Sequence, residues 1–199
     1  IFGGDAGTVT VDNTGGAEMF ASLVDVASDG ALRNTGGTIR GDETLLDIGG
    51  GIDNRGGTLR GDKWIDIAAG GDIDNTGGLV QGGIVAIAGT GAVDNTDGRV
   101  LGSRIDVVVG GEILNQGAGK IVADDLVSLE GKRLDNTGTV QGGGVTRAQR
   151  LACGCLRKCS DHVHAGPAPA SAHGHPGGQP QSVETRLFPR FLVLLLKKL

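Results

Sequence analysis

The sequence of 199 residues is poor in aromatic side chains, and most of it lacks cysteine, proline and histidine altogether. It contains no Tyr, one Trp and four Phe. An ordinary globular core of this size draws much of its apolar area from aromatic rings, so a core of that kind is not expected. Burial must instead come from Ile, Val and Leu, which are plentiful and would have to be arranged regularly.

The scarce residue types and the charges divide the chain near position 144. Residues 1–144 hold 21 of the 23 acids and 10 of the 18 bases, a formal charge of −11, and no Cys, His or Pro. Residues 145–199 hold the other 2 acids and 8 bases, a formal charge of +6. The acidic first segment argues against nucleic acid as a partner, because Lys and Arg are needed to replace the counterions of a polyanion. The predicted domains are therefore 1–144 and 145–199.

Asparagine reveals an internal repeat in the first segment. The seven Asn residues of the chain follow one another at spacings of 21, 20, 21, 20, 20 and 21 residues. They are Asn13, Asn34, Asn54, Asn75, Asn95, Asn115 and Asn136. An aliphatic residue stands two positions before each Asn, and Thr-Gly-Gly follows three of the seven, Asn13, Asn34 and Asn75. Self-similarity at a fixed period of this length is typical of solenoid proteins.

Between successive asparagines the sequence alternates in the manner of β-strands. Aliphatic pairs separated by one residue occur in each repeat, as Val24/Val26, Leu46/Ile48, Ile65/Ile67, Val85/Ile87, Ile105/Val107 and Val127/Leu129. Period two places these pairs inside and the residues between them outside, namely Asp25, Asp47, Asp66, Asp106 and Ser128. The density of Gly and the lack of any apolar pattern at 3.6 spacing exclude helix.

These patterns predict an all-β fold, a right-handed parallel β-helix (solenoid) of about 20-residue coils over about residues 8–144. Each coil would hold two or three strands of about 3–5 residues between Gly-rich corners, paired with the next coil about 4.8 Å away. The Asn side chains are predicted to point inward and to hydrogen-bond from coil to coil, with positive φ at the glycines that follow. A leucine-rich repeat also carries a periodic Asn, but its fixed leucines and helical side are not seen.

The repeated unit resembles a known family. The segment LLDIGGGIDNRGGTLRGDKWIDIAAGGDIDNTGG, residues 45–78, is similar to the haemagglutinin repeat of filamentous haemagglutinins, related haemolysins and contact-dependent inhibition exoproteins. The resemblance covers about residues 8–144. It implies the structural shaft of a large secreted bacterial adhesin, exported by two-partner secretion through an outer-membrane transporter to the cell surface. The lack of Cys and Pro in residues 1–144 fits such an export route.

Alternatives remain within this architecture. The repeats are also expected in the stalk of a contact-dependent growth inhibition exoprotein, or in a truncated remnant without function.

The family's secretion domain would lie far upstream, so the chain is expected to be an internal piece. Uncapped strand edges at both ends would then favour end-to-end association. A host-cell or bacterial surface receptor is a further expected partner.

Two tripeptides, Arg40-Gly41-Asp42 and Arg60-Gly61-Asp62, occupy equivalent repeat positions. On an exposed turn they could bind a receptor. The equivalent positions in later repeats read Gln-Gly-Gly and Leu-Gly-Ser, which favours a Gly-centred structural corner instead.

No enzyme activity and no cofactor are predicted. The uniform repeats leave no long loops to form a cleft for a polysaccharide, and no Ser-His-Asp or Cys-His set can be assembled without His. The outward acids are interpreted as a solvated face.

Residues 145–199 are predicted to be a low-complexity, disordered tail, or the product of a shifted reading frame. A cluster of potential Zn²⁺ ligands lies there, namely Cys153, Cys155, Cys159, His162 and His164, but its spacing fits no paired structural zinc site. The apolar run 191–196 is too short to span a bilayer, so no membrane span is expected.

Overall fold

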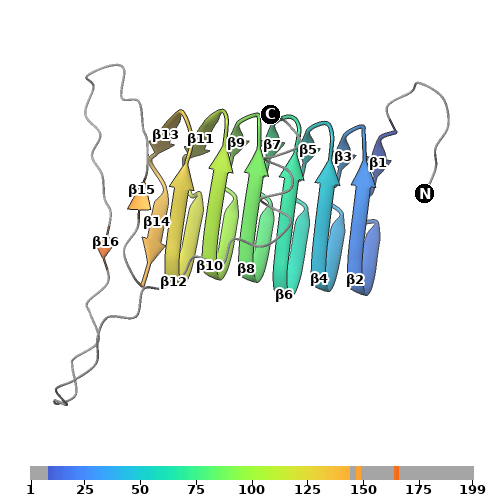
Figure 1. Ribbon diagram of the computed structural model, residues 1–199, viewed down its shortest axis with the longest axis horizontal. Coiled ribbons are helices and arrows are strands. Elements are labelled where there is room, and N and C mark those ends of the chain that lie inside the picture. Colours follow the sequence, from blue (N-terminus) through green and yellow to red (C-terminus); the bar gives the residue numbers. More distant parts are fainter. Residues whose placement is uncertain (1–8, 144–146, 149–163, 166–199) are drawn as a thin grey trace, which may run out of the picture. The chain divides into compact units, whose positions relative to one another are not determined.

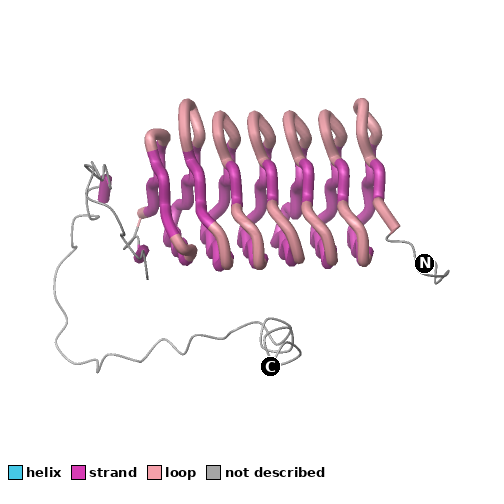
Figure 2. Tube along the Cα trace, turned by 90° about the horizontal axis from the view of Figure 1, so that it is seen from above, coloured by secondary structure: helices cyan, strands magenta, loops and turns pink. Residues whose placement is uncertain are grey.

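The computed structural model describes residues 9–143, 147–148 and 164–165. Every regular element in this part of the chain is a strand. The strands form a parallel β-solenoid of about seven turns with about 20 residues in each coil. The predicted fold class is therefore confirmed. Figure 2 shows the successive coils side by side, each repeating the path of the one before.

Short strands next to the asparagines form one sheet. In spatial order, which is also chain order, they are β1 (Val11–Asp12), β3 (Leu32–Arg33), β5 (Ile52–Asp53), β7 (Ile73–Asp74), β9 (Val93–Asp94), β11 (Glu112–Asn115) and β13 (Arg133–Asn136). Each pairs in parallel with the short strand of the next coil.

Long strands form the second sheet, again with each coil pairing in parallel with the next. They are β2 (Glu18–Ser28), β4 (Thr38–Ile48), β6 (Thr58–Ala69), β8 (Leu79–Gly89), β10 (Arg99–Val109), β12 (Lys120–Glu130) and β14 (Thr139–Gly142). In Figure 1 strands β2 to β12 rise on the near side and the short strands lie on the far side as the chain advances from β1 to β13, which is a right-handed winding. Parallel crossovers have this hand almost without exception.

Each coil holds two strands, within the predicted two or three, but their lengths differ from the prediction. The two segments expected as separate strands of about 3–5 residues form one long strand that bends at a glycine, such as Gly41 or Gly61. Backbone pairing with the neighbouring coil continues on both sides of the bend, with only local register shifts there. The glycine corner therefore turns the chain without ending the hydrogen-bonded ladder.

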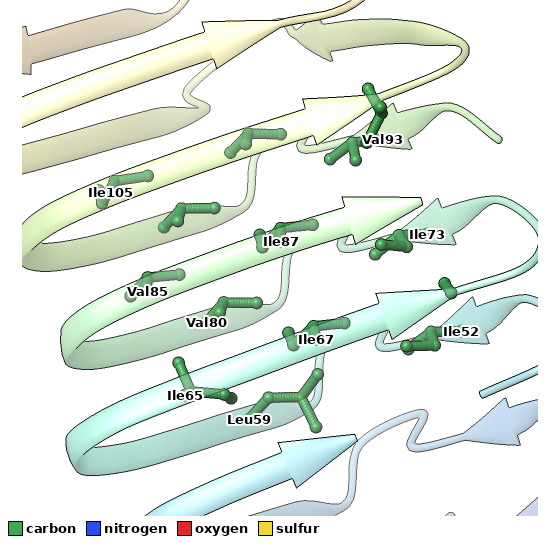
Figure 3. Close-up of a cluster of buried hydrophobic side chains, with 14 of the residues drawn as sticks. Ile52, Leu59, Ile65, Ile67, Ile73, Val80, Val85, Ile87, Val93 and Ile105 are labelled. Atoms are coloured by element: carbon green, nitrogen blue, oxygen red, sulfur yellow. The ribbon is translucent and has the colours of Figure 1, made fainter. Parts of the chain in front are cut away.

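The core consists of aliphatic columns that run from coil to coil (Figure 3). One column contains Ile52, Ile73 and Val93 from the short strands, and each of these is at most 3% exposed. A second contains Ile67 and Ile87 from the long strands. The inward positions predicted from period-two alternation are thus confirmed, and equal residues stack because the parallel register repeats.

One part of the predicted alignment was wrong. Leu46/Ile48 is not equivalent to Ile65/Ile67, because Thr44 pairs with Ile65 and Leu46 pairs with Ile67. Thr44 fills an aliphatic slot, fully buried, and its hydroxyl donates to the carbonyl oxygen of Arg60 at 2.7 Å. A buried Thr with a satisfied hydroxyl is easily missed when only aliphatic residues are aligned. Asp47 is exposed as predicted, but it lies in register with Ala27 and Ala68 rather than with Asp25 and Asp66.

Coils of 21 residues differ from coils of 20 by local insertions. Between Gly61 and Trp64 the chain has two residues, whereas the equivalent corner of β8 has only Gly83. The same extra residue occurs in β12, at Asp124–Asp125. The hydrophobic columns stay in register across these insertions because the added residue lies at the corner.

Two further short strands, β15 (Arg147–Ala148) and β16 (His164–Ala165), pair with β12 and β14 respectively. Ala148 lies in register with Leu129. The rest of the predicted tail, including Cys153, Cys155, Cys159 and His162, lies outside the described residues, and so does the side chain of His164.

The inward and outward assignments can be tested with one pair of neighbouring substitutions. Ile87→Asp places a charge in a column where the side chain is 1% exposed, and we expect a loss of at least about 4 kcal/mol of unfolding free energy. Ala88→Asp makes the same substitution one residue later on the outward face and should cost less than about 1 kcal/mol. Urea denaturation followed by circular dichroism measures both. Equal losses would contradict the assignment.

Candidate functional site: the asparagine ladder and the outward columns

The asparagine side chains form a continuous hydrogen-bonded ladder through the coils. In each step the Nδ2 amide of one Asn donates to the Oδ1 of the Asn in the next coil. The Nδ2–Oδ1 distances are 2.7 Å for Asn13–Asn34, Asn34–Asn54, Asn54–Asn75, Asn75–Asn95 and Asn95–Asn115, and 2.6 Å for Asn115–Asn136. The predicted bonding from coil to coil is confirmed for all seven residues, and the inward position is confirmed for Asn13 to Asn115.

The second N–H of each amide is also satisfied. Asn34 Nδ2 donates to the carbonyl oxygen of Thr58 at 3.1 Å, and the equivalent bond recurs from Asn13 to Asn115. Six of the ladder residues, Asn13 to Asn115, are at most 3% exposed. Burial of a polar amide is costly unless its donors and acceptors are paired. The ladder meets that condition, and all donors point toward the C-terminal coils.

In the central coils the two glycines that follow the Asn serve different purposes. The first, such as Gly36 or Gly77, has a φ of 63°, in the left-handed region. Asp97 takes this place in its coil with a φ of 56°. The second glycine leaves no room for a side chain, because a Cβ on Gly57 would lie 2.0 Å from the carbonyl oxygen of Asn34. The first glycine shapes the corner, and the second lets neighbouring coils approach closely enough for the ladder.

Charged residues beside the ladder pair on the outer surface. The Arg55 guanidinium contacts Asp53 of its own coil at 2.6 Å and Asp74 of the next coil at 3.6 Å. Its hydrogen bond to the Asp53 carboxylate is the main reason that the pKa of Asp53 falls to about 2. Asp53, Asp74 and Asp94 stack in register, so Arg55 relieves repulsion at one end of this acidic series.

The two Arg-Gly-Asp tripeptides lie at stacked corners, with Gly41 in register with Gly61. Gly82 and Gly102 continue the same column, which confirms the Gly-centred corner. Asp62 accepts hydrogen bonds from Arg40 at 3.0 Å and from Arg60 at 2.6 Å. These bonds hold the pKa of Asp62 below its ordinary value. The Arg40 guanidinium also lies 5.7 Å from the centre of the Phe20 ring.

This geometry ties the tripeptide charges to each other. In residues 60–62 both charged groups are already paired, and Arg40 of the first tripeptide shares the same carboxylate. A receptor that recognises separate Arg and Asp side chains would have to break these contacts. Asp42 is exposed. Receptor binding by Arg40, Gly41, Asp42, Arg60, Gly61 and Asp62 stays a prediction.

A depression of about 360 Å³ lies along the corners between β6 and β12. Its floor includes Gly82, Gly83, Gly102 and Ser103. The longer corners at Asp62 and Asp124 stand on either side of the shorter corners of β8 and β10. The depression therefore follows from the two inserted residues.

Among the described residues, neither a metal-ligand cluster nor a membrane-spanning helix occurs. They contain no group of three or more His, Cys, Asp or Glu side chains placed to hold a metal ion. Within the same residues no helix is long and apolar enough to cross a bilayer. The prediction that the protein is not an enzyme stays a prediction.

The sequence interpretation missed the outward position of Trp64. This side chain directly precedes the buried Ile65 in β6 and is half-buried on the opposite face, in register with Glu43 and Ile84. Period-two alternation alone would have placed it there. The chain's one Trp therefore lies on the outer sheet surface and not in the core.

No protein-family model, curated protein or solved structure matches the chain. The class of protein is thus defined by the structure itself, as a parallel β-solenoid with an asparagine ladder.

The ladder can be tested at its middle. Asn75→Asp replaces the donating amide by an acceptor that faces Asn95 Oδ1, so we expect a loss of about 2–5 kcal/mol of unfolding free energy at pH 7. Burial raises the pKa of the new carboxyl in the folded state. Its protonated form is then favoured on folding, so this variant should regain stability relative to the unsubstituted protein as pH falls toward 4.

Asn136→Asp is the matched control. Asn136 accepts the bond from Asn115, and within the described residues it donates no ladder bond, so a carboxylate can still accept there. Urea denaturation at pH 7 and pH 4 measures both variants. Equal losses for the two substitutions, without dependence on pH, would contradict the ladder's directed donor pattern.

The glycine pair gives a second test. Gly57→Ala brings a methyl group against the Asn34 carbonyl and should cost more than about 2 kcal/mol of unfolding free energy. Gly56→Asp repeats a substitution that Asp97 already makes at a positive φ, with no atom within 4 Å of the new Cβ, and should cost about 1 kcal/mol or less. Thermal denaturation compares them, and a larger loss for Gly56→Asp would refute the distinction.

Proposed function

We propose that the coils are part of the structural shaft of a large secreted bacterial adhesin of the filamentous haemagglutinin type. The observation that carries this proposal is the unbroken stacking of equivalent coils. Each coil repeats the same ladder bond and the same aliphatic columns, and its corners differ by a single residue. A shaft needs this property, because its length grows with the number of coils while its cross-section stays constant.

The contacts also suit export of an unfolded chain. Each strand pairs with its equivalents in the two adjacent coils, and the main contacts run between neighbouring coils. Folding can therefore propagate from one coil to the next as the chain leaves a transporter. Residues 9–143 contain no Cys or Pro, so their folding requires neither disulfide formation nor prolyl isomerisation.

Two-partner secretion and a cell-surface location follow from the same proposal. The family resemblance of residues 8–144 supports them, together with the solenoid fold. The shaft would hold a binding or toxic tip away from the cell, and its outward residues would be free to vary.

Surface exposure on the producing cells tests this function. Antibodies against residues 9–143 should label intact cells or the culture medium, and loss of the partner outer-membrane transporter should abolish that signal while the cell-associated protein persists. A cytoplasmic marker that is labelled only after lysis is the control. If the coils are detected only after lysis, even with the transporter present, the shaft function is wrong.

A further inference from the structure

The outer face of the long strands carries a column in which carboxylates alternate with neutral side chains. The registered positions, from β2 to β12, are Asp25, Leu45, Asp66, Ala86, Asp106 and Ser128. We name this set the acid column. The acids stand on every second coil, so adjacent carboxylates lie about 9.6 Å apart, which is twice the strand spacing. This arrangement avoids like charges directly opposite each other.

The two columns beside it are mostly apolar and acidic. One contains Leu23, Glu43, Trp64, Ile84, Arg104 and Leu126, and the other contains Ala27, Asp47, Ala68, Ala88, Val108 and Glu130. The three columns together hold six carboxylates and one guanidinium, that of Arg104. Glu43 is paired with Lys63 at 3.4 Å. The face thus combines an aromatic side chain with more acidic than basic side chains.

A second copy of the same face is a poor occupant, because it would bring acid columns against each other. The charge complementarity instead favours a basic partner whose positive charges recur at about 9.6 Å along the coil axis.

We propose that this face binds an extended, proline-rich segment with Lys or Arg at every third residue. Such a segment forms a polyproline II helix, whose three-residue turn rises about 9.3 Å and presents every third side chain on one side. Six residues of it rise about 18.6 Å, and the four coils from Asp25 to Asp106 span about 19.2 Å. Basic side chains would therefore meet Asp25 and Asp106 at the ends, with Asp66 midway.

Other regular peptides fit this spacing less well. A β-strand presents side chains on one face every 6.6–6.8 Å or so, which falls out of step with the acid column. Two turns of an α-helix rise about 10.8 Å, so the mismatch grows to more than about 2 Å over four coils.

The apolar side chains give the proline rings a surface. Trp64 lies two residues before Asp66 on the same face of β6, and Ile84 is its neighbour in β8. Polyproline II segments commonly dock on aromatic side chains in this way, because the preformed helix loses little conformational entropy on binding. This inference does not depend on the shaft function, since it concerns a surface that the isolated chain already presents.

Fluorescence of Trp64, the one Trp of the chain, tests the proposal directly. The full chain is titrated with three synthetic peptides of equal length. The first is (Pro-Pro-Lys)5, the second is a block peptide of the same composition with all its prolines before all its lysines, and the third is (Pro-Pro-Glu)5. The regularly spaced basic peptide should change the emission and bind at least several-fold more tightly than the block peptide, and (Pro-Pro-Glu)5 should not bind. Binding of (Pro-Pro-Lys)5 should weaken in about 0.5 M NaCl, where the screening length is only about 4 Å.

Substitutions then locate the site. Asp25→Asn and Asp106→Asn should each weaken the (Pro-Pro-Lys)5 complex about two- to fivefold, as expected for exposed ion pairs. Asp47→Asn, outside the acid column, is the matched control and should have little effect. Equal affinity for the two lysine peptides, or equal effects of all three substitutions, would overturn the proposal in favour of unspecific charge attraction. A response to cello-oligosaccharides but not to (Pro-Pro-Lys)5 would overturn it in favour of a polysaccharide.

Discussion

A single side-chain hydrogen bond, repeated in every coil, constrains the rest of this solenoid. From Asn13 to Asn115 the amide of each Asn donates to the amide oxygen of the Asn in the next coil at 2.6–2.7 Å, and these six donors have almost no access to water. Such a bond exists only if equivalent residues of neighbouring coils lie directly above one another. A shift by one residue would turn the Asn outward and leave its partner's amide buried without a hydrogen bond. The ladder therefore fixes the register, and the aliphatic columns on either side follow it.

The need for close stacking explains where the sequence is strict and where it varies. The second glycine after the Asn is retained because a methyl group on Gly57 or Gly78 would collide with the preceding ladder residue. Insertions lie instead at the corners, as at Asp62–Lys63 and Asp124–Asp125, where they displace no inward side chain. The outward columns are under neither constraint. They can carry acids, small residues and Trp64 without disturbing the core, so a recognition surface on this scaffold would reside there.

The fold could be predicted from the sequence because its period is short and its signal recurs. Seven asparagines with an aliphatic residue two positions before each, as in Ile73 and Asn75, defined the coil, the inward face and the ladder. The register of the long strands was harder to predict, because Thr44 occupies a position that is aliphatic in the other coils. An alignment based on aliphatic residues alone therefore paired Leu46 with Ile65, whereas Leu46 pairs with Ile67. The sharing of Asp62 between Arg40 and Arg60 depends on contacts between coils, and the sequence pattern carries no signal of these. The outward face of Trp64 could have been predicted from alternation.

The most direct test of the central claim is hydrogen exchange of the Asn side-chain amides, followed by NMR on the labelled full chain. All seven Asn belong to the ladder, so every Asn side-chain signal reports on it. The account predicts that the Nδ2 protons of Asn34, Asn54, Asn75 and Asn95 exchange far more slowly than those of an exposed amide, because both N–H groups are bonded in the core. Exchange of these four amides at the rate of an exposed Gln side chain would show that no ladder holds the coils in register.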